Sequence, residues 1–259
     1  MARILSIGRM PADAARPDNE VDSIHFFTRG PRHLEYHYYE AMVTPDIIHT
    51  VIEAELRGYD AVTIGCFYDL ALHESREMTT NLVVTAPCEA SVLAVASLCD
   101  RFSIIVGRRK WVPQMRANVS AYGFGERLAS MPYIDLRVPE YHLDEAETAD
   151  RFYKAGRKAI DEDGAEALIL GCTASVGFFR DLQTALGVPV IDPAIAALKH
   201  AEHLIELRDR FGWATSRVGG YEHPPAFELD PWDLPHQYGF DDVTAFWNVP
   251  EGGTILAGN

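Results

Sequence analysis

The sequence predicts an α/β fold with two pseudosymmetric lobes, each a parallel sheet flanked by helices. Three observations predict this fold. Short aliphatic runs that end in glycine alternate with helix patterns, as they do in βαβ units. The chain resembles itself at an offset of 106 residues. Its 259 residues, 47% of them hydrophobic, are enough to bury a core in each lobe.

The alternation assigns the elements in order. Buried strands are expected at residues 3–8, 61–65, 102–107 and 167–171, because each is a short β-branched or aliphatic run that stops at a glycine. A first helix is expected to begin with Thr44 as its N-cap and Pro45 at its first position, with apolar residues on one face as far as Leu56. Further helices are expected at about 89–100, 113–122, 144–163, 176–186 and 194–208.

The internal repeat pairs residues whose types have backbone or chemical meaning. Without a gap, the offset of 106 superposes the pairs Gly58 and Gly164, Gly65 and Gly171, Cys66 and Cys172, and Pro87 and Pro193. Residues 7–9 and 106–108 match at a nearby offset of 99. The repeat therefore predicts a first lobe over residues 1–100 and a second over 101–208, and it leaves open a return of the last helix to the first lobe.

Residues 209–259 form an extension of different character. They hold five of the 15 prolines and three of the 4 tryptophans, and helical periodicity disappears. Aromatic residues in loops need a surface to bury against. We expect an irregular strap over a lobe or a subunit contact, with a lid over the site as the alternative.

Charge and hydropathy narrow the class of partner. The net charge of −15 repels nucleic acid and anionic membrane surfaces. The chain holds no apolar run of eighteen residues, and its first residues carry too short an apolar stretch for a signal peptide. We expect a cytoplasmic protein that acts on a small molecule, without nucleic acid or membrane as a partner.

Two of the four cysteines are candidates for chemistry. The chain has no C-x-x-C pair and no short Cys/His spacing of the kind that a metal site needs. If the lobes face each other, Cys66 and Cys172 lie at one cleft, each after a strand and at the start of a helix, where a thiol pKa is lowered. One thiolate can remove a proton from a carbon while the opposed thiol delivers another to the other face. Such stereoinversion needs no cofactor.

Three segments carry a family resemblance: residues 65–72 (GCFYDLAL), 162–173 (EDGAEALILGCT) and 187–192 (GVPVID). They resemble the aspartate/glutamate/hydantoin racemase superfamily, closest to its hydantoin racemase branch, over roughly residues 1–208. The resemblance implies a cofactor-independent isomerase with its active site between two lobes, and Cys66 and Cys172 as the acid/base thiols. The expected substrate is a hydantoin or an amino-acid derivative, and a homo-oligomer is implied.

The substrate end of the site departs from that pattern. The hydantoin racemase branch usually has Asn-Pro-Asn-Thr after the first strand, where this chain has residues 7–11 (IGRMP). After the third strand, residues 107–110 (GRRK) replace the family's small hydroxyl residues. Arg9, Arg108 and Arg109 follow strand ends and could bind a carboxylate bidentately, which favours an acidic substrate. The alternative is that these arginines are only solvent-exposed loop residues. The candidate substrate-binding residues are Gly8, Arg9, Phe67, Gly107, Arg108 and Thr173.

Other hypotheses stay open at this point. Superfamily relatives include arylmalonate decarboxylases, which keep one of the thiols, and maleate isomerases, in which a thiol attacks covalently. Both act on small diacids, and the presence of both cysteines argues against the decarboxylase. A ligand-binding protein that closes on a small molecule is a third hypothesis.

Several further residues have competing interpretations. Cys88 and Cys99 are expected to pack in the core. Thr173 and Ser175 either cap the next helix, which is favoured, or face the substrate. The remaining polar candidates near the strand ends are His73, Glu74, Glu89 and Asp192.

Overall fold

The computed structural model describes residues 1–11, 13–24 and 29–246, and it contains two four-stranded parallel sheets. The first sheet has the order β2 (Glu20–Ile24), β1 (Arg3–Ile7), β3 (Ala61–Ile64), β4 (Val83–Thr85). The second has the order β6 (Leu128–Ser130), β5 (Phe102–Ile105), β7 (Ala167–Leu170), β8 (Val190–Ile191). The two sheets therefore share one topology, and the predicted fold class is confirmed. The boundary between lobes at residue 100 stays a prediction.

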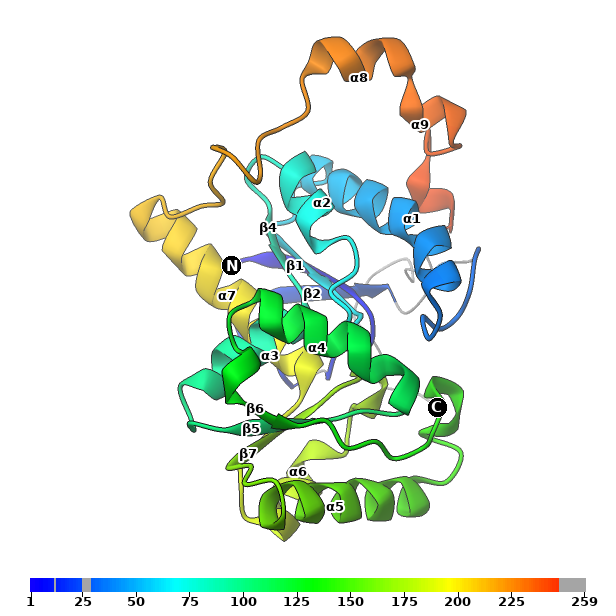
Figure 1. Cartoon of the computed structure of the whole chain (residues 1–259). Helices are drawn as coiled ribbons and strands as arrows, with labels where there is room; N and C mark the ends of the chain where they lie inside the picture. Colours follow the sequence, from blue (N-terminus) through cyan, green and yellow to red (C-terminus); the bar gives the residue numbers. More distant parts are fainter. Residues whose placement is uncertain (12, 25–28, 247–259) are drawn as a thin grey trace.

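Helices cover both faces of each sheet (Figure 1). From top to bottom in that view, the layers are α1 with α2, the first sheet, α7 with α3 and α4, the second sheet, and α5 with α6. The helices of these layers are α1 (His37–Leu56), α2 (Leu72–Met78), α3 (Pro87–Ala96), α4 (Val112–Ala121), α5 (Glu145–Asp161), α6 (Phe179–Leu186) and α7 (Pro193–Phe211). Short 3-10 helices are η1 (Arg109–Trp111), η2 (Gly125–Arg127), η3 (Val138–Glu140) and η4 (Thr173–Ser175).

The helix α1 begins earlier than the sequence predicts. Thr44 and Pro45 lie inside it, and the helix starts at His37. The Thr44 hydroxyl donates back to the carbonyl oxygen of Glu40 at 2.8 Å, one turn earlier, instead of capping a new helix. The prediction failed because a proline also fits inside a helix when packing supports the turn before it. Elsewhere the expected helices and strands are present with ends shifted by a few residues.

Two helices cross over between the halves of the molecule. Helix α7 packs its Ala194, Leu198 and Ile205 against the first sheet, in one cluster with Ile4 and Val83. Helix α3, which begins at Pro87, places its buried apolar residues in the core of the second sheet. Helix α7, which follows the last strand of the second sheet, therefore covers one face of the first sheet. Helix α3, which follows the last strand of the first sheet, packs against the second sheet.

The extension differs from the irregular strap that was expected. It contains α8 (Ala226–Trp232), α9 (Leu234–Gln237) and the 3-10 helix η5 (Val243–Phe246). Prolines at or near helix starts are compatible with these short helices, because the first turn needs no N–H donor. The segment runs over α1 and α2 (Figure 1) and anchors there through Phe240, whose ring stacks on His49 at 3.9 Å. Trp213 and Trp232 remain exposed, and Trp247 lies outside the described residues.

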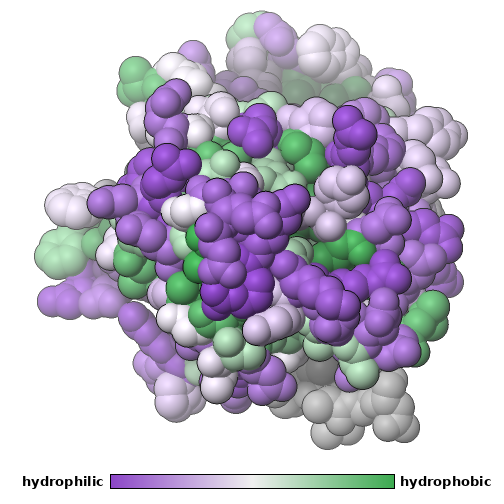
Figure 2. Space-filling model, turned by 60° about the horizontal axis from the view of Figure 1, so that its bottom comes forward, coloured by the Kyte–Doolittle hydropathy of each residue, from purple (hydrophilic) through white to green (hydrophobic). Residues whose placement is uncertain are grey.

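The surface near α5 and α6 is mostly hydrophilic. Figure 2 shows hydrophobic atoms there mainly in hollows between hydrophilic side chains. None of the helices in the described part of the chain is both long and apolar enough to cross a membrane.

Candidate active site

The strand register brings the ends of neighbouring strands together in both halves. In the first sheet Ile7 pairs with Ile64, so Gly8 and Gly65 follow side by side. A Cβ on Gly65 would lie 1.7 Å from the carbonyl oxygen of Ile7, which only glycine avoids. In the second sheet Ile105 pairs with Leu170, and the N–H of Gly171 donates to Ile105 O at 2.7 Å. Cys66 and Cys172 come directly after these glycines.

A hydrogen bond joins the two cysteine loops, which we define as residues 65–69 and 172–175. The Thr173 hydroxyl donates to the carbonyl oxygen of Gly65 at 2.8 Å. The thiols are also near enough for a charge on Cys172 to raise the pKa of Cys66. Both cysteines are partly exposed. Residues 106 positions apart in the sequence are therefore neighbours in space.

The prediction that each cysteine lies at the start of a helix holds for Cys172, which is the N-cap of the short 3-10 helix η4, but not for Cys66. Residues 66–69 form a turn, with the N–H of Asp69 donating to Cys66 O at 2.9 Å, and α2 begins only at Leu72. In the second loop the N–H of Ser175 donates to Cys172 O at 3.1 Å, and α6 begins only at Phe179. The turns intervene because the chain must leave each strand end in a tight loop, which puts Asp69 in the left-handed region with φ of 53°.

The first cysteine loop inserts into the second half of the molecule. Phe67 and Tyr68 are buried in the core cluster of the second sheet. The side-chain amide of Asn118 on α4 donates to the carbonyl oxygen of Tyr68 at 2.6 Å. The Tyr68 phenol lies near both thiols, whose charges raise its pKa further after burial.

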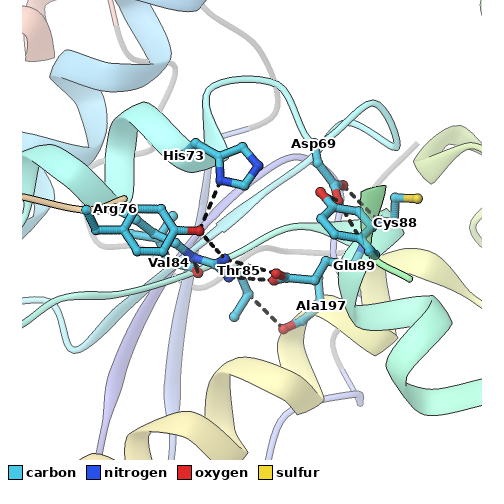
Figure 3. A network of polar contacts seen from close by, with 10 residues as sticks. Asp69, His73, Arg76, Val84, Thr85, Cys88, Glu89 and Ala197 are labelled. Carbon is cyan, nitrogen blue, oxygen red and sulfur yellow. Dashed lines mark hydrogen bonds and ion pairs between the residues drawn. The ribbon is translucent and has the colours of Figure 1, made fainter. Parts of the chain in front are cut away.

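Asp69 connects this loop to two helices. Its carboxylate accepts the N–H groups of Cys88 and Glu89 at 2.7 and 2.8 Å, at the start of α3. The Tyr122 hydroxyl at the end of α4 donates to it at 2.7 Å. Figure 3 shows Asp69 facing Cys88, and Arg76 facing Glu89 beside it. Because Asp69 is only 6% exposed, burial raises its pKa to about 7 despite these donors.

The second cysteine loop is anchored differently. The buried Ser175 hydroxyl donates to Cys172 O. His142 contacts Ala174 O through Nε2 at 2.8 Å and stacks on Phe178. The Tyr141 hydroxyl lies close enough to the Cys172 thiol to act on its pKa, which it lowers. Each of these contacts comes from within the second half of the chain.

The thiols are less acidic than the sequence analysis expects. Burial raises the pKa of Cys66, and the N–H of Tyr68, which donates to its sulfur, offsets this only in part. Burial raises the pKa of Cys172 to about 12, although the N–H of Ala174 and the Tyr141 hydroxyl act in the opposite direction. The predicted lowering failed because desolvation outweighs the donors once both sulfurs lie against the core.

Carboxylates dominate the charge around the thiols. Glu40 and Asp69 raise the pKa of Cys66, and Glu35 raises that of Cys172. Glu35 is 2% exposed and accepts the N–H of Val138 at 3.0 Å. It also binds the Arg108 guanidinium at 3.2 Å. The positive charge of this predicted substrate-binding arginine is therefore already paired.

The other predicted substrate-binding residues occupy varied places. Gly8 lies against Gly65, and Arg9 is exposed. Gly107 is buried under Trp111 and Tyr141, which lie 2.3 and 2.6 Å from where its Cβ would be. Arg109 starts η1 and is exposed. Thr173 does not cap a helix, because its hydroxyl is committed to Gly65 O.

The remaining candidates have structural partners. Cys88 is buried in the core as predicted, whereas Cys99 is partly buried and contacts Val95 O. Glu89 is paired with Arg76, and Asp192 caps α7 by accepting the N–H groups of Ala194 and Ile195. His73 contacts the Tyr221 hydroxyl at 3.0 Å in the extension, and Glu74 is exposed.

Glu35, Asp69 and Tyr141 are among the residues near the cysteines that were not singled out from the sequence. Asp69 had a usable signal, since the offset of 106 pairs it with Ser175 and puts a polar residue three positions after each cysteine. Glu35 and Tyr141 also pair with each other at the offset of 106, so the repeat places each of them at the same spacing before its cysteine.

A groove of about 670 Å³ lies elsewhere, between residues 130–134 and α5, with Arg151, Lys154 and Lys158 among its lining residues.

In the part of the chain that the structure describes, no group of three or more His, Cys, Asp or Glu residues is arranged to hold a metal ion.

Comparisons with known proteins identify the family of this chain. The family model described as Asp/Glu/Hydantoin racemase matches residues 8–201. The chain is 31% identical to a hydantoin racemase of Pseudomonas sp. (strain NS671), covering 86% of this chain and 88% of the relative. It is 36% identical to a hydantoin racemase of Paenarthrobacter aurescens, covering 76% and 82%. Among solved structures, an allantoin racemase from Klebsiella pneumoniae superposes with a TM-score of 0.78 at 27% identity, covering 87% of this chain and 94% of that one.

Proposed function

Because this chain belongs to the Asp/Glu/hydantoin racemase family and is an isomerase of the racemase type, we propose that Cys66 and Cys172 are its acid and base. The proposed reaction inverts a stereocentre next to a carbonyl, without a cofactor, between the two cysteine loops. The observation that carries the proposal is the hydrogen bond of 2.8 Å from Thr173 to Gly65 O, since it joins the two loops directly.

In the proposed reaction, the thiolate of one cysteine takes the proton from the stereogenic carbon. The electron pair of that C–H bond moves toward the adjacent carbonyl and forms an enolate. The thiol of the other cysteine then gives its proton to the opposite face of the carbon. The enolate returns to a carbonyl, and the two sulfurs have exchanged their protonation states. No atom other than hydrogen is transferred, so no co-reactant is needed.

The charges favour a neutral substrate ring. Glu40 and Asp69 act on Cys66 and Glu35 acts on Cys172, each raising the thiol pKa, and the positive charge of Arg108 is already paired with Glu35. A dicarboxylate would add further negative charge, whereas hydantoin rings offer N–H donors and an acidic carbon beside a carbonyl. The hydantoin and allantoin racemases among the relatives support the same choice. We propose a 5-substituted hydantoin as substrate, in place of the acidic substrate that the loop arginines suggested.

The test is proton NMR in D2O with single enantiomers of 5-substituted hydantoins. We expect deuterium to enter the stereogenic position together with inversion. The variants Cys66→Ala and Cys172→Ala should each lose inversion by about 10²–10⁴-fold, the usual worth of a positioned acid or base. Cys99→Ala is the matched control and should keep wild-type rates, since its sulfur donates to Val95 O near the end of α3, outside this site.

The rate should also depend on pH in a defined direction. Because burial raises both thiol pKa values, the thiolate population grows about ten-fold per pH unit through the neutral and mildly alkaline range, and kcat/KM should rise with it. Inversion that survives in either cysteine variant would exclude the two-thiol mechanism. A diacid that loses carbon dioxide or changes geometry, while every hydantoin keeps its proton, would favour the decarboxylase or the cis–trans isomerase.

A further inference from the structure

We propose that Arg217 and Tyr221 of the extension are positioning residues for Cys66, which they hold in place through helix α2. Both lie beyond residues 8–201, the part of the chain that the family model matches. The inference rests on the proposed function for its catalytic meaning. It gives the extension a part in the reaction without placing any of its residues on the substrate.

Helix α2 is joined to Cys66 by hydrogen-bonded backbone. The N–H of Asp69 donates to Cys66 O at 2.9 Å, and the N–H of Leu72 donates to Asp69 O at 3.2 Å. Two successive turns therefore connect Cys66 to Leu72, the first residue of α2. Because this connection has no slack, a displacement of α2 also displaces the backbone of Cys66.

The carboxyl end of α2 is bound by Arg217. The helix has seven residues, and helices of this length are not stable in water without tertiary contacts. The N–H of Thr80, which would close the last turn of a longer helix on Arg76 O, donates to the Glu55 carboxylate at 3.0 Å instead. The Arg217 guanidinium donates to Arg76 O through Nη1 and to Thr80 O through Nη2, the latter at 3.0 Å. Its charge also has the favourable sign for a helix C-terminus.

Tyr221 binds two side chains of the same helix. Its hydroxyl lies 3.4 Å from Arg76 Nη1 and 3.0 Å from His73 Nδ1, and its ring stacks on the His73 imidazole at an interplanar angle of 16°. Because a guanidinium has only donors, the Tyr221 oxygen accepts from Arg76 and its own hydrogen is available to His73 Nδ1. One hydroxyl thus connects two residues that lie three positions apart, on one face of α2.

Arg76 connects these contacts to the helix that anchors the first cysteine loop. Its side chain is 11% exposed and binds both carboxylate oxygens of Glu89, with 2.9 Å between Nη1 and Oε1 (Figure 3). Glu89 lies in the first turn of α3, and its N–H donates to the Asp69 carboxylate at 2.8 Å. Asp69 and Arg76 therefore fix both ends of residues 69–76 to the same turn of α3.

The contacts of the extension favour the first cysteine loop over the second. Arg217 and Tyr221 are partly buried, whereas residues 218–220 between them are exposed. Their side chains bind residues 73–80 of the first half. The loop of Cys172 is held by contacts within the second half, as described above. Loss of either side chain should therefore displace Cys66 more than Cys172.

The first test is turnover of a single-enantiomer 5-substituted hydantoin. Arg217→Gln should lower kcat about ten-fold and leave KM unchanged, because a displaced acid or base is felt in the transition state more than in binding. Tyr221→Phe, which removes one oxygen from a partly exposed ring, should lower kcat about three-fold. Arg217→Lys keeps a charged donor and should recover part of the loss. The matched controls, Arg210→Gln and Tyr238→Phe, change exposed residues outside this network and should keep wild-type rates.

The second test is alkylation by iodoacetamide at a fixed pH, with mass spectrometry of the peptides that contain each cysteine. Local opening of the first cysteine loop would make its sulfur more accessible. Arg217→Gln and Tyr221→Phe should therefore raise the rate at Cys66 relative to Cys172, by at least about three-fold for Arg217→Gln. The controls should leave this ratio unchanged.

A kcat that both variants leave unchanged, or an equal change of labelling at both cysteines, would overturn the proposal. If Arg217→Gln fails to fold, Tyr221→Phe decides alone. Labelling needs no turnover. If no hydantoin is inverted even by the wild-type protein, the proposed function fails, and the labelling ratio still decides whether the extension holds Cys66.

Discussion

The two cysteine loops share a backbone and differ in what anchors them. In each, the N–H three positions after the cysteine returns to the cysteine carbonyl, at 2.9 and 3.1 Å. The first loop is held from outside, because Asp69 reaches the start of α3 and the end of α4. The second loop is held in its own half by Ser175 and His142, and it is joined to the first half by the bond from Thr173 to Gly65 O.

The helices that follow show where this difference comes from. Helix α7 has a local cap, since Asp192 accepts the N–H groups of Ala194 and Ile195. The equivalent position before α3 is Ala86, which has no side-chain acceptor, and Asp69 supplies the missing carboxylate from the cysteine loop. The capping carboxylate of α3 comes from the Cys66 loop instead of from the residue before the helix, and it therefore ties this loop to α3. The position of the Cys66 loop should therefore depend on α3 more strongly than the position of the Cys172 loop depends on α7.

The largest expected difference lies at the glycines before the cysteines. Gly65→Ala would place a Cβ 1.7 Å from the backbone oxygen of Ile7, so the strands must separate. At Gly171 the nearest atoms are side-chain carbons of Ile104 and Val106, at 2.8 and 2.9 Å, which can shift. We expect a loss of at least about 3 kcal/mol of unfolding free energy for Gly65→Ala and about 1–2 kcal/mol for Gly171→Ala. Urea denaturation measures both, and equal losses would contradict the difference in packing.

A smaller difference is expected three residues after each cysteine. Asp69→Ala leaves two buried N–H groups and the Tyr122 hydroxyl without their acceptor, which costs about 3 kcal/mol. Ser175→Ala removes one hydroxyl bond and costs about 1 kcal/mol. Chemical denaturation of both variants compares the loops directly. Asp192→Ala serves as the control for loss of a local cap, at about 1 kcal/mol. A loss at Asp69 no greater than at Asp192 would mean that the loop is not anchored through α3.

A third difference is expected in the pH dependence of stability. Burial raises the Asp69 pKa from 3.8 to about 7, so folding favours the neutral carboxyl. The resulting stabilisation is complete below about pH 4 and is lost as pH rises to about 7. Asp69→Asn cannot ionise, so the stability of the wild-type protein relative to this variant should decline across that window. Ser175→Ala, which removes no titratable group, should show no such trend, and a flat difference for Asp69→Asn would refute the assignment.

Much of the architecture could be predicted from local patterns. The alternation of aliphatic runs and helix patterns predicts the parallel sheets, because periodicity reports which faces are buried. The repeat predicts that Cys66 and Cys172 hold equivalent places, and the shared strand order agrees. Pro87 and Pro193 both stand in the first turn of a helix, as their equivalence suggests. These features depend on residues close together in the chain or on its internal similarity.

The sequence by itself therefore determined the two-sheet fold and the equivalent positions of Cys66 and Cys172 in its two halves. Only the tertiary structure decided how each cysteine is held and how acidic it is. The Thr173 hydroxyl bonds to Gly65 O, Asp69 accepts an N–H of α3, and Tyr141 lies near Cys172. Each of these contacts joins residues too far apart in the sequence for a helix or strand period to connect them. The thiol pKa values moved opposite to the local expectation, because burial depends on the whole packed core. Local patterns report the backbone, whereas desolvation and long-range hydrogen bonds exist only once the chain has folded.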